Sequence, residues 1–327
     1  MSETMRVQRV AVIGAGTMGA AIAELLAFNG IEVVLKDVSP ELVDRGLARV
    51  RRLVDELVAF HSGRVDKEQE RLAGLGIELT PEQLERLRSR WKPKVTPERG
   101  EEIVARVRGI TDWSPLGEVD LVIEAVFEEL SVKREVLSAV DRALPVHGVI
   151  ASNTSSLSIS RLARGLGHVR ETLVTHFFNP PSTLPLVEVA GGVDTREDVI
   201  TEMIDFLQGL QNHRYPLVPI RVKESPAFLV NRLLMPVLNE ACFALEEGLA
   251  SARDIDTAMK AGAGMPMGPF ELADLVGLDV ALDVTETLAR EFGDSKYRAA
   301  VTLRRLVDAG HLGRKTGQGF YEYATTS

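Results

Sequence analysis

The first two thirds of the chain alternate between short apolar runs and longer segments whose apolar residues recur every three or four positions. Runs rich in β-branched residues and bounded by glycine or polar residues are typical of buried strands, and the longer periodicity is typical of helices. The expected strands lie at 9–16, 31–37, 120–126, 148–153 and 215–222. Strands that alternate with helices in this order predict an α/β domain with a parallel sheet.

The segment after the second expected strand predicts a long amphipathic helix. Ser39 can cap it, Pro40 suits its first position, and apolar residues follow at spacings of four and three. This apolar stripe consists of Val43, Leu47, Val50, Val54 and Leu57. The segment therefore has one apolar helix face.

A charged insertion, from about Phe60 to Arg108, separates this helix from the next expected strand. It contains two further helix starts, Thr80-Pro81 and Thr96-Pro97, each of which pairs a capping residue with a proline at the first helical position. We expect extra helices that stand off the sheet. They are either a solvated decoration or a lid over a ligand, and the residues leave both interpretations open.

The last third of the chain is expected to be almost entirely helical. Helical periodicity covers four segments, at 225–248, 251–262, 281–292 and 299–310. The first would begin with Ser225 as its cap and Pro226 at its first position, and the second opens with a capping-box pattern. The chain is therefore predicted to divide into an α/β domain of residues 1–222 and a helical domain of residues 223–327.

Composition narrows the classes of function. The chain has 327 residues, of which 45% are hydrophobic and 26% charged, enough for about two domains with a sizeable core. Its formal net charge of −9 argues against nucleic acid or an anionic membrane surface as a partner, because both bind basic faces.

Cysteine content and hydropathy indicate the compartment. The single cysteine, Cys242, excludes an intramolecular disulfide and is interpreted as a buried structural thiol in a reducing compartment. The first ten residues lack the apolar core of a signal sequence, and no apolar run reaches the roughly 18 residues of a membrane span. We expect a cytoplasmic protein.

Three glycines, Gly14, Gly16 and Gly19, form the pattern GxGxxG where the first strand turns into a helix. At such a turn, backbone amides and the helix dipole can hold a pyrophosphate that meets no side chain. Asp37 ends the second strand, near the spacing of about 20 residues at which a carboxylate accepts the ribose hydroxyls of the adenosine half. The same carboxylate would repel a 2′-phosphate, so NAD is favoured over NADP. Lys36 precedes it, but strand alternation directs Lys36 to the opposite face; the alternative to the whole interpretation is a tight turn that binds nothing.

A second candidate site lies in 175–192, where two apolar runs are joined by a proline-rich turn. An antiparallel hairpin centred on Ser182 would place His176 opposite Glu188. A carboxylate that fixes one imidazole nitrogen leaves the other as a proton acceptor and stabilises the imidazolium that forms. Oxidation of an alcohol by nicotinamide requires this, because hydride leaves only as the hydroxyl proton is removed. A structural His–Glu pair within a sheet is the alternative that this stretch alone leaves open.

Two further polar residues are candidates. Ser155 follows the expected strand at 148–153, at the carboxyl edge where open α/β sheets bind ligands, and could donate to a substrate oxygen. Its alternative role is to cap a helix that starts at Leu157. Asn231 lies in an apolar helix just after the domain junction, where its amide could reach a cleft. An asparagine satisfied by backbone groups is the equal alternative.

Motifs along nearly the whole chain together resemble the short-chain L-3-hydroxyacyl-CoA dehydrogenase family, including its 3-hydroxybutyryl-CoA branch. They are "VAVIGAGTMGAAIA", "DLVIEAVFEELSVK", "ASNTSSLSI", "HFFNPP" with "LVEV", "SPAFLVNRLL", "GMPMGPFELADLVGLD" and "KTGQGFYEY". The resemblance implies a Rossmann-type N-terminal domain with a helical lid insertion, followed by an all-α C-terminal domain that forms a homodimer. It also implies NAD as cofactor, an acyl-CoA thioester as substrate, and a place in fatty-acid β-oxidation or butanoate metabolism.

The resemblance also implies roles for individual residues. His176 would be the general base toward the 3-hydroxyl, and Glu188 would orient it. Ser155 and Asn231 would hydrogen-bond the reacting oxygen or the neighbouring thioester. The cofactor contacts would be Gly14, Gly16, Thr17, Met18, Gly19, Asp37, Glu128, Lys133, Ser155, Asn179 and Lys315. No metal is expected.

The chain departs from the family pattern in two places. Ala227 stands where the family commonly has glycine, shortly before Asn231. The serine and lysine that bind coenzyme A in relatives have no residue-by-residue counterpart in the longer region 60–108. Five basic residues are candidate phosphate partners, or else ordinary surface charge: Arg49, Arg51, Arg52, Lys92 and Lys94.

Three functions follow from the resemblance. The leading one is a reversible NAD-dependent oxidation of an (S)-3-hydroxyacyl-CoA to the 3-oxoacyl-CoA. A related 3-hydroxy acid dehydrogenase, of the gulonate or carnitine type, is the second, and "HFFNP" favours the CoA branch over it. The third is a non-catalytic structural protein such as the crystallin members of the family. The intact set of candidate catalytic residues disfavours this third function.

Overall fold

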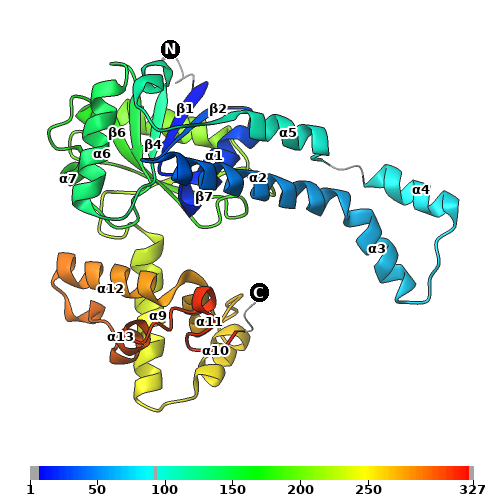
Figure 1. Cartoon of the computed structure of the whole chain (residues 1–327). Coiled ribbons are helices and arrows are strands. Elements are labelled where there is room, and N and C mark those ends of the chain that lie inside the picture. The colour runs from blue at the N-terminus through cyan, green and yellow to red at the C-terminus, as the bar shows by residue number, and fades with distance from the viewer. Residues whose placement is uncertain (1–6, 92–93, 324–327) are drawn as a thin grey trace. The chain divides into compact units, whose positions relative to one another are not determined.

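The computed structural model describes residues 7–91 and 94–323 (Figure 1). The chain divides into two compact units, one formed by residues 1–154 and 159–221, the other by residues 155–158 and 222–327. The division after Arg221 falls one residue before the boundary expected from the sequence. The short loop 155–158 groups with the helical unit, although it follows a strand of the first.

The first unit is built on an eight-stranded sheet with the strand order β3-β2-β1-β4-β5-β6-β7-β8. The strands are β1 (Arg9–Ile13), β2 (Glu32–Lys36), β3 (Val107–Ile110), β4 (Leu121–Glu124), β5 (Val149–Ser152), β6 (Thr172–Phe177), β7 (Leu186–Gly191) and β8 (Val218–Arg221). Neighbouring strands pair in parallel except β6 and β7, which form an antiparallel pair. The predicted α/β fold with a Rossmann-type sheet is therefore confirmed.

Both faces of this sheet are buried, as a mostly parallel sheet requires. Val10 and Val12 on one face belong to a hydrophobic cluster that includes apolar residues of α1, α2 and α8. Ala11 and Ile13, which alternate with them, are also buried. The helices of this unit that cover the sheet are α1 (Thr17–Phe28), α2 (Pro40–Ser62), α6 (Leu130–Ala143), α7 (Ile159–Ala163) and α8 (Glu197–Gln208). Figure 1 shows helices on both sides of the sheet.

The apolar stripe predicted for α2 faces the core. Four of its five residues are buried, and Leu47 is partly buried against the same cluster. Ser39 caps the helix by accepting a hydrogen bond from the amide of Leu42. The cap, the N1 proline and the spacing were thus sufficient to predict this helix.

After the end of α2, the described residues of the charged insertion form three helices, α3 (Arg64–Ala73), α4 (Pro81–Arg90) and α5 (Pro97–Ala105). Both predicted starts are confirmed, since Thr80 caps α4 in a capping box and Thr96 caps α5. No residue of α3 or α4 is buried.

The C-terminal end of the insertion was predicted wrongly. α5 does not stand off the sheet, because Ile103 is fully buried in the main core, and β3 begins at Val107, inside the expected range. β3 was missed because it is a four-residue edge strand that contains Arg108 and Gly109 and gives no apolar run. The exposed helical part of the insertion is therefore α3 and α4.

The second unit is helical, as predicted. Its helices are α9 (Val230–Glu246), α10 (Ala252–Ala261), α11 (Pro269–Val276), α12 (Leu278–Phe292) and α13 (Val301–Asp308). Apolar residues of α9, α11, α12 and α13 form its core. Short 3-10 helices lie at Ser295–Tyr297 and Arg314–Thr316 in this unit, and at Ser114–Glu118 and Val169–Glu171 in the first unit. None of the helices in the described part of the chain combines the length and the apolar character that a membrane crossing needs.

The expected start of α9 at Ser225 and Pro226 is wrong. These residues form a turn in which the amide of Phe228 donates to the carbonyl of Ser225, 3.1 Å away, and the helix begins at Val230. Ala227 has a φ of 60° and Phe228 a φ of 52°, both in the left-handed region. Proline at the second position of a turn followed by a left-handed residue is a type II arrangement, in which glycine is preferred. Ala227 therefore carries backbone strain.

Two buried aspartates tie the end of the described chain to the helical unit. The carboxylate of Asp274 accepts hydrogen bonds from the amides of Phe320 and Tyr321 and from the hydroxyl of Tyr323. Asp256 accepts one from the hydroxyl of Tyr321 at 2.8 Å. The closing motif "KTGQGFYEY" is thus held by charged acceptors inside the unit.

The single cysteine, Cys242, lies in α9 and is buried. Burial raises the pKa of its thiol to about 12. The thiolate is therefore scarce at neutral pH, and the prediction of a structural thiol is confirmed.

Candidate active site

The glycine-rich turn between β1 and α1 has glycine for two separate reasons. Gly14 has a φ of +105°, and a Cβ on it would lie 2.6 Å from the carbonyl oxygen of Ala125. A Cβ on Gly19 would lie 1.8 Å from the carbonyl oxygen of Gly14. Gly16 differs, because a Cβ there would have no atom within 4 Å. The fold requires glycine at positions 14 and 19, whereas Gly16 leaves space that a bound group can use.

The turn leads directly into α1, whose N-terminal end faces this space. Gly16 is the N-cap residue, and no side chain caps the helix. Thr17, the first helical residue, is exposed, and Met18 packs partly against the core. The amides of a first helical turn have no partners within the helix and attract anions. The residues present therefore fit the pyrophosphate of a dinucleotide.

Asp37 follows the last residue of β2 and is anchored on the glycine-rich turn. One carboxylate oxygen accepts a hydrogen bond from the amide of Ala15, and the other accepts from the amide of Val38, both at 2.7 Å. The carboxylate is thus fixed at the point where an adenosine ribose of a dinucleotide is expected. This geometry agrees with the spacing argument from the sequence.

His176 and Glu188 lie opposite each other in the β6–β7 hairpin, as the sequence predicted. The register pairs them directly, and Nδ1 of His176 lies 2.8 Å from Oε2 of Glu188. Glu188 is fully buried and His176 is 6% exposed. The ring of Phe178 contacts the imidazole, with centroids 4.6 Å apart. Since Glu188 holds Nδ1, Nε2 is the nitrogen that can exchange a proton with a ligand.

Asn153, at the end of β5, helps to place the histidine strand. Its side-chain oxygen accepts a hydrogen bond from the amide of Phe177 at 2.9 Å. Asn153 was not among the residues predicted from the sequence to belong to the site. An asparagine directly after a buried strand, next to the candidate Ser155, was the available signal.

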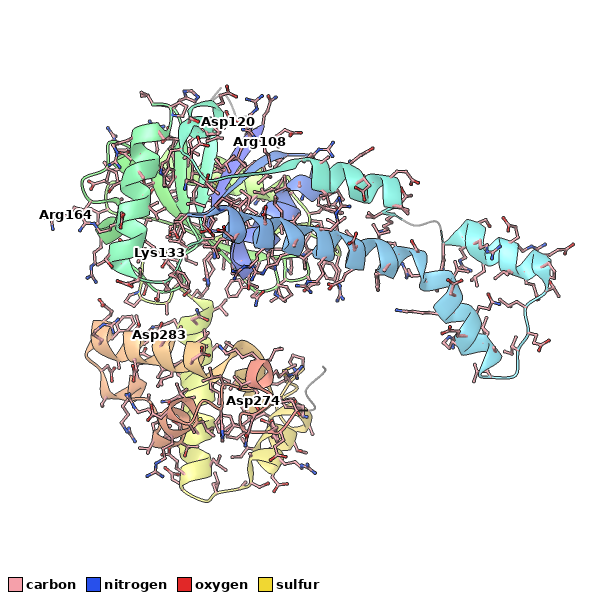
Figure 2. All side chains as sticks on the ribbon, viewed as in Figure 1. Arg108, Asp120, Lys133, Arg164, Asp274 and Asp283 are labelled. Atoms are coloured by element: carbon pink, nitrogen blue, oxygen red, sulfur yellow. The ribbon has the colours of Figure 1, made fainter. Side chains whose placement is uncertain are left out.

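A buried ionic network lies at the carboxyl ends of β4 and β5. Glu124 is fully buried and Lys133 is 1% exposed, and the Nζ of Lys133 lies 2.7 Å from Oε1 of Glu124. Lys133 also lies 3.2 Å from Glu128 and donates to the carbonyl of Val126. The second oxygen of Glu124 accepts from the hydroxyl of Ser152 at 2.6 Å. Figure 2 labels Lys133 on α6.

This network bears on two predicted cofactor contacts. The three acceptors around Lys133 match the three N–H donors of an ammonium, so its contacts organise the loop after β4. Glu128 is partly exposed and accepts from the hydroxyl of Thr154 at 2.6 Å. The network was missed from the sequence, although a glutamate inside the apolar run "DLVIEAV" is a signal of a buried paired charge.

Ser155 and Asn179 lie in loops that follow strands of the sheet. Ser155 is partly buried and follows β5, and α7 begins only at Ile159. The alternative in which Ser155 caps a helix starting at Leu157 is therefore wrong. Asn179 is exposed in the turn after β6.

Asn231 and Lys315 belong to the helical unit. Asn231 is the second residue of α9 and is partly buried. Lys315 lies in the closing motif, where both carboxylate oxygens of Asp279 accept from its amine at 2.5 and 2.6 Å. Their roles at a substrate or cofactor stay predictions.

The candidate phosphate partners are mostly engaged within the first unit. Arg49 donates to the carbonyl of Ala15 at 3.1 Å, which ties α2 to the glycine-rich turn. Arg51 pairs with Glu101, and Arg52 pairs with Glu56. Lys94 is exposed, and Lys92 lies outside the described residues.

The glycine-rich turn and the histidine pair belong to one sheet, at the carboxyl ends of β1 and β6. A cradle for a dinucleotide and an imidazole oriented by a buried carboxylate define the class as a nicotinamide-dependent dehydrogenase. Family models are more specific. The 3-hydroxyacyl-CoA dehydrogenase NAD binding domain matches residues 9–84 and 64–224, and the 3-hydroxyacyl-CoA dehydrogenase C-terminal domain matches residues 228–323. The chain belongs to the 3-hydroxyacyl-CoA dehydrogenase family, whose cofactor is NAD.

Individual relatives agree with this family. The chain is 36% identical to a 3-hydroxybutyryl-CoA dehydrogenase of Clostridioides difficile, over 96% of this chain and 99% of the relative. It is 36% identical to the mitochondrial hydroxyacyl-coenzyme A dehydrogenase of Sus scrofa, over 97% and 91% of the two chains. A solved structure of (S)-3-hydroxybutyryl-CoA dehydrogenase from Ralstonia eutropha matches with a TM-score of 0.82 and 38% identity, over 98% of this chain and all of that one.

Proposed function

We propose that this enzyme catalyses the reversible NAD-dependent oxidation of an (S)-3-hydroxyacyl-CoA, such as 3-hydroxybutyryl-CoA, to the 3-oxoacyl-CoA. The observation that carries the proposal is the His176–Glu188 pair, in a chain whose glycine-rich turn fits a dinucleotide. A 3-hydroxyl group has to lose its proton as its carbon loses hydride, and a buried imidazole oriented by a carboxylate accepts that proton.

Each partner of the pair has one task in the proposed reaction. Nε2 of His176 accepts the hydroxyl proton, and the carboxylate of Glu188 holds Nδ1 and stabilises the imidazolium. Bound NAD supplies a hydride acceptor. Oxidation thus converts the hydroxyl and its C–H bond into a carbonyl, with the proton on His176. In the opposite direction the imidazolium returns its proton to the oxygen.

The remaining candidate residues are proposed to bind and orient the reactants. Ser155 and Asn231 would hydrogen-bond the reacting oxygen or the thioester carbonyl. The other proposed cofactor contacts are Glu128, Asn179 and Lys315, beside the glycine-rich turn and Asp37. Lys133 was also predicted to contact the cofactor, but its three N–H donors meet protein acceptors, so we propose that it acts by holding Glu128. Support for Glu128 comes from the buried Lys133 and from Thr154, which fix its carboxylate.

The test of the proposed function is NADH consumption with acetoacetyl-CoA, with free acetoacetate as the control. We expect turnover with the thioester and little with the free acid. Turnover of free acetoacetate alone would favour the second candidate, a related 3-hydroxy acid dehydrogenase. A folded protein that binds NADH without any turnover would favour a structural role.

We expect a preference for NAD over NADP of at least about a factor of ten, or roughly 1.4 kcal/mol. The carboxylate of Asp37 is fixed by the amides of Ala15 and Val38, so it cannot swing away from a 2′-phosphate. The measurement is kcat/KM for the two reduced cofactors with acetoacetyl-CoA. Equal values would contradict the role given to Asp37.

We propose that α3 and α4 form a lid that binds the coenzyme A part of the substrate. Their residues are all at least partly exposed, so they contribute little to the core. Replacing residues 64–91 with a short Gly-Ser linker should therefore raise KM for acetoacetyl-CoA far more than KM for NADH. A melting curve checks that the shortened protein folds. If both constants stay unchanged, the insertion is a solvated decoration.

We also propose that the enzyme is a cytoplasmic homodimer that associates through its helical C-terminal unit. Leu233 and Val237 support this, because they are 65% and 40% exposed and lie four residues apart on one face of α9. Exposed apolar residues at this spacing suit a helix–helix interface. The mass of the protein in solution tests the dimer. The single, buried cysteine agrees with a reducing compartment.

A further inference from the structure

A buried lysine lies next to the aspartate that is expected to bind the adenosine ribose. Lys36 is the last residue of β2, 3% exposed, and it immediately precedes Asp37. Its side chain makes different contacts from that of Asp37, whose carboxylate binds the amide of Ala15. Its Nζ lies 3.8 Å from the centroid of the Trp113 ring and donates to the backbone carbonyl of Asp37 at 3.4 Å.

Charges around Lys36 keep the ammonium in this position. Burial lowers the pKa of Lys36, while Asp37 and Asp112 act in the opposite direction. Asp112 accepts hydrogen bonds from the amide and the hydroxyl of Ser114, and the hydroxyl contact is the main reason why the pKa of Asp112 lies below its ordinary value. Asp112 is therefore charged at neutral pH, and it fixes the turn that carries Trp113.

The position of this cation matters for the choice of cofactor. NADPH differs from NADH by a 2′-phosphate on the adenosine ribose, which a carboxylate repels and a nearby lysine attracts. Here both charges come from adjacent residues at the end of one strand. The carboxylate of Asp37 faces the glycine-rich turn, whereas the ammonium of Lys36 is held on the Trp113 ring.

We propose that Trp113 is a specificity-determining residue, which holds the Lys36 ammonium away from the adenosine ribose so that Asp37 alone sets the preference for NAD. This inference rests on the proposed role of Asp37. A cation–π contact of this kind is worth about 0.5 to 2 kcal/mol depending on its desolvation. Without the ring, the Lys36 ammonium keeps only its contact with the Asp37 carbonyl and the attraction of Asp37 and Asp112, and its four-carbon stem can then move the charge toward a 2′-phosphate.

The experiment compares the dissociation constants of NADPH and NADH, measured by nicotinamide fluorescence, in four proteins. These are the wild type, Trp113→Leu, Lys36→Met and the double variant. Trp113→Leu should lower the NADPH-to-NADH ratio of dissociation constants about three- to tenfold, within the range of one cation–π contact. Lys36→Met should not lower the ratio, and the double variant should behave like Lys36→Met. The gain should shrink at high salt, since it is electrostatic.

A matched control uses the only other tryptophan. Trp91 also lies under a cation, with the guanidinium carbon of Arg64 4.9 Å from its ring centroid, but it follows α4 in the insertion. Trp91→Leu should leave the ratio unchanged. Melting curves check folding, and if Trp113→Leu does not fold, Trp113→Phe replaces it and should give a smaller decrease that again depends on Lys36.

Two outcomes would overturn the proposal. One is an unchanged NADPH-to-NADH ratio of dissociation constants in folded Trp113→Leu or Trp113→Phe. The other is a decrease in this ratio that is just as large when the Trp113 substitution is made in the Lys36→Met protein. Asp37→Ser separates this failure from failure of the ribose assignment. If Asp37→Ser leaves the ratio unchanged, the assignment of Asp37 itself is wrong. If it lowers the ratio while Trp113→Leu does not, only the role of Trp113 fails.

Discussion

His176→Ala is expected to lower the turnover number by about two to four orders of magnitude, the usual worth of a positioned acid–base group. NADH affinity should hardly change, because His176 lies on β6 while the proposed pyrophosphate site lies between β1 and α1. The measurement is single-turnover hydride transfer at saturating acetoacetyl-CoA, with NADH binding followed by fluorescence. Near-normal hydride transfer in the folded variant would reduce the pair to a structural contact within the sheet.

Glu188→Gln extends this prediction to the orienting partner. Glutamine retains the shape and a hydrogen bond but loses the charge that stabilises imidazolium, so turnover should fall here as well. The double variant should fall well short of the product of the two losses, because the residues act as one unit. Fully multiplicative losses would show that Glu188 acts independently of His176.

The chain provides a matched control for the histidine variants. His168 is also buried and paired with a carboxylate, with its Nδ1 2.7 Å from Oδ1 of Asp141. Its Nε2 lies 2.9 Å from the carbonyl oxygen of Pro145, and it precedes β6 at the amino edge of the sheet. His168→Ala should therefore cost stability while hydride transfer stays near normal.

Gly16→Val is expected to weaken NADH binding by about a hundredfold, or about 2.8 kcal/mol. Gly16 has an ordinary φ of −69°, and a Cβ would meet no protein atom within 4 Å, so the variant should fold. The added side chain would project into the space reserved for the pyrophosphate. Dissociation constants and melting temperatures should be measured together. Unchanged affinity would mean that the cofactor does not approach this turn.

Gly117→Val is the matched control for this variant. A Cβ on Gly117 also meets nothing within 4 Å, but this glycine lies in the 3-10 helix Ser114–Glu118, away from the glycine-rich turn. It should fold and bind NADH normally. A comparable loss of NADH affinity in both variants would point to a general effect of the substitution.

Features encoded over short distances were predicted well from the sequence. The hairpin register follows from the turn and from the alternation of apolar residues, so the sequence alone was sufficient to pair His176 with Glu188. The caps of α2, α4 and α5 were likewise local signals. The long motif match added the family and its cofactor.

Features that depend on distant residues were missed. The Glu124–Lys133 pair joins β4 to α6, and periodicity does not indicate which charges become buried together. β3 is stabilised by its pairing with β2, since its own four residues carry little strand signal. The start of α9 was wrong because Ser225-Pro226 suits both a helix cap and a type II turn, and the residues alone do not decide between them.

The hairpin that contains His176 and Glu188 also bears on how the site forms during folding. The two residues are separated by only 12 positions, so bringing them together closes a short loop at a small entropic cost. Contacts this local form early relative to contacts between distant parts of a chain. The proton-accepting pair can therefore assemble early, within the first unit.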